Sequence, residues 1–132
     1  MWPFRGRCDG GDVGRRGERL ARRILRKGGM KILATNYRCP AGEVDLIALD
    51  RSTRKAMGAE TLVFVEVKTR TSDRYTDPEA AVNSDKQRRI RKVAGYYRTR
   101  RGAEDYNVRY DIVSVVLRPG AEPQIKHIPD AF

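Results

Sequence analysis

Charged residues interrupt two apolar runs in this chain of 132 residues. The run Leu62–Thr69 contains Glu66 and Lys68, which share one face if the run is a strand, because strand side chains alternate between faces. The run Glu43–Leu49 contains Asp45 on its apolar face. A buried charge costs free energy unless it pairs or binds something. Two neighbouring strands that each carry such an acid therefore indicate a site.

The residue types at this site suit hydrolysis of a phosphodiester. Two carboxylates, Asp45 and Glu66, together with a backbone carbonyl beside Glu66, form an oxygen-only ligand set that fits Mg²⁺ or Mn²⁺. Such an ion acidifies a bound water and neutralises charge on the reacting phosphate. Lys68 would orient or deprotonate that water and contact the phosphate. An acid, a gap of twenty residues and then Glu-x-Lys is the PD-(D/E)xK pattern of nucleases.

The charge balance predicts a polyanionic partner. Lys and Arg number 28 against 17 Asp and Glu, a net charge of +11. The segment Lys86–Arg101 holds eight Lys or Arg and no acid, and a second cluster lies within 13–27. The candidate phosphate contacts are Lys86, Arg88, Arg89, Arg91, Lys92, Arg15, Arg19 and Arg22. A solvated helix face is the alternative interpretation of such a charge run.

Several classes of function are excluded by what the chain lacks. One His and two Cys cannot supply a structural zinc site, and a lone His near a Pro does not favour Ser-His-Asp or Cys-His catalysis. We expect His127 to be structural and to have no partner. No apolar run approaches the roughly 20 residues of a membrane helix, and residues 1–27 contain no signal-peptide h-region. We therefore expect a cytoplasmic protein that does not enter a membrane.

The apolar periodicity predicts helices and strands in an α/β order. Residues 1–12 are expected to form a flexible basic tail, and residues 13–132 a single domain. We predict a mixed sheet flanked by helices. The expected helices are 13–27, a short turn at 77–82, and 85–101, with a buried stripe of Ile90, Val93, Ala94 and Tyr97. The expected strands are 31–37, 43–49, 61–69, 108–117 and 124–128, with a long polar loop at 50–60.

A stack of short motifs along the chain resembles the YraN family. They are Gly17-Glu18-x-x-Ala21, Ile32-Leu33-x-x-Asn36-x-Arg38, Gly42 to Ala48, Leu62 to Arg70, Pro78-x-x-Ala81-Val82, Lys86 with Arg89-Ile90, and His127-Ile128-x-x-Ala131-Phe132. These bacterial proteins are similar to Holliday-junction resolvases, so the resemblance implies a restriction-endonuclease-like fold. It also implies Asp45, Glu66 and Lys68 as the metal-binding and catalytic core, with Glu18 assisting. The resemblance favours DNA over RNA as substrate, and a homodimer, because a junction has two symmetric cuts.

Other interpretations of these residues remain open. Glu66 and Lys68 also fit a partly exposed ion pair at a strand end, and Glu18 a surface salt bridge with neighbouring Arg residues. Asp111 fits either a further acid near the site or an edge-facing side chain. A non-catalytic nucleic-acid-binding module with a structural acidic pocket is one alternative function. A basic adaptor that docks on an acidic protein or ribosomal surface is another.

Overall fold

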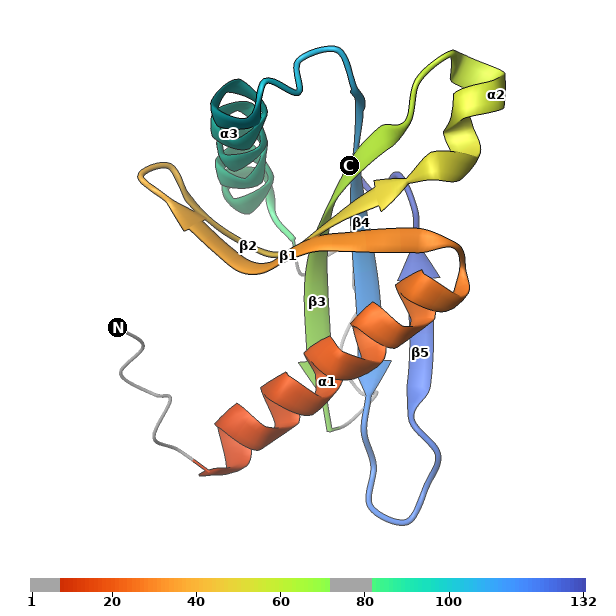
Figure 1. Ribbon diagram of the computed structural model, residues 1–132. Coiled ribbons are helices and arrows are strands. Elements are labelled where there is room, and N and C mark those ends of the chain that lie inside the picture. Colours follow the sequence, from red (N-terminus) through yellow and green to blue (C-terminus); the bar gives the residue numbers. More distant parts are fainter. Residues whose placement is uncertain (1–7, 72–81) are drawn as a thin grey trace.

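Two long helices cover opposite faces of a five-stranded sheet (Figure 1). The computed structural model describes residues 8–71 and 82–132, with side chains from Asp12 onward in the first helix. The helices are α1 (Cys8–Lys27), the short α2 (Arg54–Met57), which follows a 3-10 turn at Arg51–Thr53, and α3 (Ser84–Arg101). The strands are β1 (Met30–Cys39), β2 (Gly42–Asp50), β3 (Thr61–Arg70), β4 (Asn107–Val116) and β5 (Gln124–Ile128).

The strands lie side by side in chain order, from β1 to β5. All neighbours are antiparallel except β3 and β4, which are parallel. Parallel neighbours need a crossover connection, and α3 lies in this one. The result is a mixed α/β sheet consistent with a restriction-endonuclease-like fold, as predicted.

The alternation of side chains along β3 divides the interior into two apolar layers. Leu62 and Phe64 pack with Ile90 of α3, whereas Val63 and Val65 pack with residues of α1. Because both faces of β3 are covered, the strand is a continuous apolar run, as buried strands are. The predicted stripe of α3, Ile90 to Tyr97, is buried in the first layer. The face assignment made from the sequence is therefore confirmed.

Several element boundaries agree with the sequence prediction and some differ. Asn83 accepts a hydrogen bond from the Lys86 amide and caps α3, which ends at Gly102 with a left-handed φ of 61°. The first helix begins at Cys8 and not at Val13, so residues 8–12 belong to α1 and not to the expected tail. An ion pair of 2.5 Å between Asp12 and Arg15 spans one turn and supports this early start.

The connection between β2 and β3 is helical rather than an open polar loop. The Asp50 carboxylate accepts hydrogen bonds from the backbone and the hydroxyl of Ser52, which starts the turn. The expected turn at 77–82 falls, up to residue 81, outside the described residues. Within the described part of the chain, no helix is both long enough and apolar enough to cross a membrane.

Candidate active site between β2, β3 and α3

Glu66 is a buried carboxylate in the middle of β3, with 5% of its surface exposed. The strand alternation places it on the same face as Leu62 and Phe64, toward α3. Burial of a charge at such a position requires a compensating partner. The ion pair of Glu66 with Lys68 that the sequence suggested is present, with Lys68 partly exposed and the Glu66 carboxylate in the interior.

Asp45 lies where β2 separates from β3. The ladder between the two strands runs from Asp50–Thr61 to Leu46–Val65 and stops there. One step further, the amide of Val67 donates a hydrogen bond of 2.8 Å to Oδ2 of Asp45. The carboxylate thus takes the place of a strand carbonyl and is held beside the Glu66 position. This split of the sheet opens the space that the two acids share.

Two lysines meet at one oxygen of Glu66. Nζ of Lys68, from the same strand, lies 3.5 Å from Oε2 of Glu66. Lys86, from the first turn of α3, contacts the same oxygen at closer range. Both lysine side chains are largely covered, with 23% and 32% of their surfaces exposed. The sequence assigned Lys86 to a phosphate-binding surface, whereas the structure brings it to the acidic group.

Burial and neighbouring charges shift the pKa values of Asp45, Lys68 and Lys86. Burial, and then the proximity of Glu66, raises the pKa of Asp45 to about 8. Burial and the neighbouring Lys86 lower the pKa of Lys68. Burial also acts to lower the pKa of Lys86, but the attraction of Glu66 outweighs it and the net shift is upward. Opposed shifts of this kind in one cleft are typical of functional sites.

A pocket of about 410 Å³ opens over Asp45, Glu66 and Lys86. Its lining consists of Gly42, Glu43, Asp45, Glu66, Lys86, Arg89 and Ile90. The donors are hard oxygens, which suit Mg²⁺ or Mn²⁺, and the like-charged pair Asp45 and Glu66 gains from a cation between them. No group of three His, Cys, Asp or Glu side chains stands ready to hold a metal in the described part of the chain. A cation here would thus rely on two carboxylates, completed by backbone oxygen or water.

Helix α1 brings a third acid near this pocket. Glu18 accepts a hydrogen bond of 3.3 Å from the amide of Asn36, and its charge contributes to the raised pKa of Asp45. The helix can come close because residue 17 is glycine. A Cβ added at Gly17 would lie only 1.8 Å from Oγ1 of Thr69, the residue after Lys68. Glu18 therefore stands near the site as predicted, and Asn36 is a neighbour that was not assigned a role.

The candidate phosphate contacts have several different environments. Arg89 lines the pocket, Lys92 and Arg19 are exposed, and Arg22 is half-buried. Arg88 and Arg15 are exposed but pair with acids one turn earlier, Asp85 and Asp12. Arg91 lies over the rings of Tyr110 and Phe132, at 5.3 and 5.4 Å. Such contacts leave part of the guanidinium available, as aromatic stacking does not use its N–H donors.

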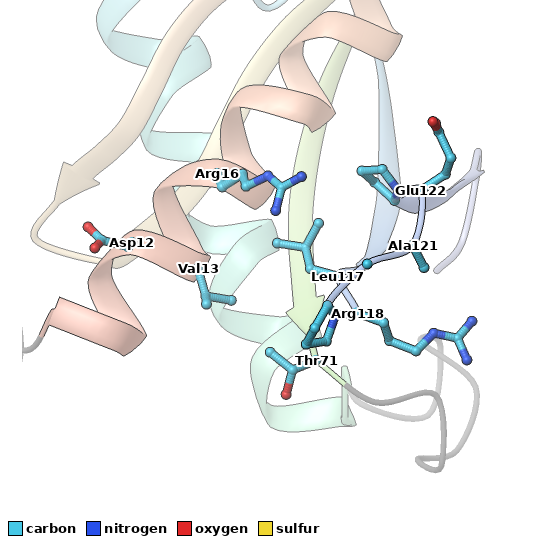
Figure 2. A pocket seen from close by; sticks show the side chains of 11 residues that line it. Asp12, Val13, Arg16, Thr71, Leu117, Arg118, Ala121 and Glu122 are labelled. Atoms are coloured by element: carbon cyan, nitrogen blue, oxygen red, sulfur yellow. The ribbon is translucent and has the colours of Figure 1, made fainter.

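A larger pocket lies elsewhere, beside α1 and the turn after β4. It has a volume of about 780 Å³, and its lining includes Val13, Arg16, Leu117 and Arg118 (Figure 2). Val13 and Arg16 come from α1, and Leu117 and Arg118 from the segment after β4. Its lining does not include Asp45, Glu66 or Lys68. The pocket of about 410 Å³ is therefore the one that contains the two predicted carboxylates, Asp45 and Glu66.

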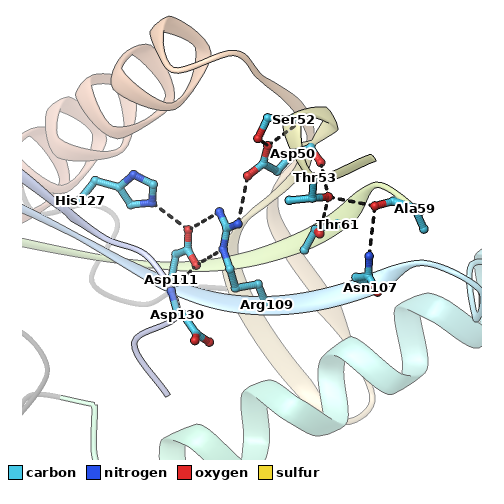
Figure 3. A network of polar contacts seen from close by, with 10 residues as sticks. All are labelled: Asp50, Ser52, Thr53, Ala59, Thr61, Asn107, Arg109, Asp111, His127 and Asp130. Atoms are coloured by element: carbon cyan, nitrogen blue, oxygen red, sulfur yellow. Dashed lines mark hydrogen bonds and ion pairs between the residues drawn. The ribbon is translucent and has the colours of Figure 1, made fainter. Parts of the chain in front are cut away.

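A second group of buried charges occupies the face of the sheet toward α1 (Figure 3). Asp111 is fully buried and accepts hydrogen bonds from Arg109 at 2.9 and 3.1 Å and from the Asp130 amide at 3.0 Å. His127 Nε2 lies 2.7 Å from the same carboxylate. Two expectations are corrected here. Asp111 is neither of the two options left open, an acid near the candidate site or an edge-facing side chain, because it lies within this second group. His127 does have a partner, because antiparallel pairing of β4 and β5 places His127 opposite Val113.

Comparison with known proteins identifies the relatives of this chain. Residues 17–115 match the model of the uncharacterised protein family UPF0102, which is the YraN family. A UPF0102 protein of Syntrophus aciditrophicus is 44% identical over 120 residues, 91% of this chain and 87% of the relative. Another, from Geobacter metallireducens, is 43% identical over 91% of each chain. A third, from Pelobacter propionicus, is 40% identical over 96% of this chain and 86% of the relative. The chain therefore belongs to the UPF0102 family, as its motifs indicated.

Proposed function

We propose that this protein is a metal-dependent endonuclease that binds nucleic acid through its basic helices and cleaves phosphodiester bonds in the acidic pocket. The observation that carries the proposal is the convergence of Asp45 and Glu66, from two adjacent strands, on one pocket. Arg89 also lines this pocket, and Lys68 lies 3.5 Å from Glu66. Two acids held side by side in a cleft, one of them with a raised pKa, are typical of functional sites.

The residues of the pocket would divide the work as follows. Asp45 and Glu66 would hold Mg²⁺ or Mn²⁺, which when bound supplies charge neutralisation at the phosphate and a more acidic water. Lys68 would position the attacking water and the scissile phosphate. Glu18 would assist from α1, near Asp45. Arg89, at the pocket, and Lys92, further along α3, would contact flanking phosphates.

The partner and setting follow from the same chemistry. A net charge of +11 favours a polyanion, and the relationship to resolvase-like folds favours branched DNA over RNA. A homodimer would allow two symmetric cuts. We further propose that the protein works in the cytoplasm, where its substrate and its cations are present.

A substrate panel tests this proposal. Labelled four-way junction, flap, duplex and single-stranded DNA, and an RNA duplex, would be incubated with Mg²⁺, Mn²⁺ or chelator. The control is a double variant, Glu66→Ala with Lys68→Ala, whose fold is verified by circular dichroism. Metal-dependent cleavage that the double variant lacks supports the endonuclease. Equal background cleavage by both proteins overturns it.

One observation favours a second candidate, a non-catalytic nucleic-acid-binding module. Glu66 is already paired with two lysines, so the pocket can also persist as a structural ion-pair group. This candidate predicts that both proteins bind DNA with the same salt dependence and that neither cleaves it. The adaptor alternative predicts weak binding to every naked nucleic acid of the panel.

A further inference from the structure

One carboxylate oxygen in the candidate site is shared by two ammonium groups that come from different elements. Lys68 is fixed by the sheet two residues from Glu66, and its Nζ lies 3.5 Å from Oε2. Lys86 reaches the same oxygen from the first turn of α3 and makes the closer contact. Both β3 and α3 border the pocket of about 410 Å³, through Glu66 and Lys86 respectively.

We propose that Lys86 is a built-in counter-ion, which a divalent cation displaces from Glu66 and which then contacts a backbone phosphate of the bound nucleic acid. The proposal rests on the proposed function and concerns the regulation of that same site. It assigns to Lys86 a positioning role that differs from that of the other basic residues of α3.

Charge balance explains why a counter-ion is needed. Asp45 and Glu66 line the same pocket, and their carboxylates repel each other when both are ionised and no cation is present. An ammonium at Glu66 relieves the repulsion in the metal-free protein. A divalent cation seeks the same oxygens and repels an ammonium at contact distance. The two cations therefore compete for Glu66, and metal affinity depends on how readily Lys86 leaves.

The position of Lys86 gives the released ammonium a destination. Arg89 lies three residues further along α3, hence on the same side of the helix, and it lines the same pocket. A phosphate that Arg89 contacts lies within reach of the flexible Lys86 side chain, of which 32% is already exposed. Lys68 has no such freedom of backbone position, because it belongs to the central strand. Cation binding would thus add one basic contact for nucleic acid.

Binding of Mn²⁺, followed by electron paramagnetic resonance without nucleic acid, tests the competition. We compare wild type with Lys86→Met, Lys86→Arg and Glu66→Gln. Lys92→Met is the matched control, since it removes the same charge from an exposed site on α3. Lys86→Met should bind Mn²⁺ about tenfold more tightly, the change expected from about 1.4 kcal/mol. Lys86→Arg and Lys92→Met should match wild type, and Glu66→Gln should bind far more weakly. Should Lys86→Met unfold, Lys86→Gln gives the same comparison.

The outcomes separate this inference from the function on which it rests. Equal Mn²⁺ affinity in wild type and Lys86→Met overturns the counter-ion role and leaves the metal site standing. Absence of Mn²⁺ binding in wild type and Lys86→Met alike overturns the metal site itself.

The second half of the inference has its own readout in duplex DNA binding. We measure affinity against salt with Ca²⁺ or with chelator. In wild type the slope of log affinity against log salt should steepen by about 0.9 with Ca²⁺, the value of one added phosphate contact. In Lys86→Met the two slopes should be equal. A wild-type slope that does not change with Ca²⁺ overturns the transfer of Lys86 to phosphate.

Discussion

The two faces of the sheet each hold a group of buried acids, and the two groups are built differently. On the α1 face, both oxygens of Asp111 are met by donors from Arg109, His127 and the Asp130 amide. Burial alone would raise its pKa, but these hydrogen bonds outweigh burial and the pKa lies below its usual range. On the α3 face, Asp45 has the Val67 amide as donor and a second acid, Glu66, as neighbour, and its pKa is raised.

The difference distinguishes a group of charges that stabilises the fold from a candidate site. The Asp111 group also includes Asp50, which Arg109 joins at 3.0 Å, so that one guanidinium links β2 to β4. Hydrogen bonds from Ser52 and Arg109 likewise lower the pKa of Asp50 against the effect of burial. A buried acid with matched donors stabilises the fold, whereas an acid held beside another acid stores repulsion that a ligand can relieve.

The largest expected effect is on the chemistry of the α3 face. Asp45→Asn should slow metal-dependent cleavage by about 1,000-fold, equivalent to about 4 kcal/mol in the barrier, because a neutral amide binds the cation poorly. Single-turnover cleavage of the preferred substrate measures it. Asp111→Asn, assayed at a temperature where it stays folded, should cleave at close to the wild-type rate. Equal loss in the two variants would erase the distinction between the faces.

The next effect is on stability at the α1 face. Asp111→Ala should lower the free energy of unfolding by about 3–5 kcal/mol, since it removes the buried carboxylate that Arg109, His127 and the Asp130 amide all contact. Urea denaturation followed by circular dichroism measures the loss. The exposed Asp105 offers a matched substitution, Asp105→Ala, expected to change stability by no more than about 0.5 kcal/mol. Comparable losses in both variants would show that the Asp111 group does not stabilise the fold.

On the α3 face, replacing the acid should raise the free energy of unfolding rather than lower it. The pKa of Asp45 rises from 3.8 to about 8 on folding, so folding takes up a proton between these values and stability falls as pH increases through this range. The amide in Asp45→Asn does not titrate, so this variant should not lose stability as the pH increases through this range. In chelator it should be more stable than wild type by at least about 2 kcal/mol at pH 8, since the full shift corresponds to at most about 5 kcal/mol, and close to wild type near pH 4.

Thermal or urea unfolding at the two pH values checks this reversal. Glu43→Gln is the control, because Glu43 lines the same pocket but is exposed. Its stability should follow wild type at both pH values. If Asp45→Asn were less stable than wild type at pH 8, Asp45 would stabilise the fold as Asp111 does.

The smallest effect refines the composition of the α1-face group. His127→Gln should lower stability by about 1 kcal/mol, because one hydrogen bond to a charged group is lost at a position with 25% of the side chain exposed. The exposed neighbour Lys126, changed to Gln, should have no measurable effect. A loss as large as that of Asp111→Ala would mean that His127, rather than Arg109, is the main stabilising partner of Asp111.

Local pattern was enough to predict much of the fold and the adjacency of the two strands that carry Asp45 and Glu66. The alternation in Leu62–Thr69 gave the faces of Glu66 and Lys68, and the spacing in α3 gave its buried stripe. Gly17 was noticed only as part of a family motif, although its close approach to Thr69 is what allows α1 to lie near the pocket. The early start of α1 was missed because glycines there hide a helix that an ion pair supports.

The sequence by itself determined the order of elements, the two faces of the sheet, the family and the presence of unusual acids in two adjacent strands. Each of these follows from periodicity, composition or motifs within short segments. Only the tertiary structure decided how the charges pair. Lys86 meets Glu66 because the first turn of α3 lies beside β3, and His127 meets Asp111 because β5 pairs with β4. Such contacts depend on the packing of elements distant in the chain, and no local pattern specifies which cation will face which acid.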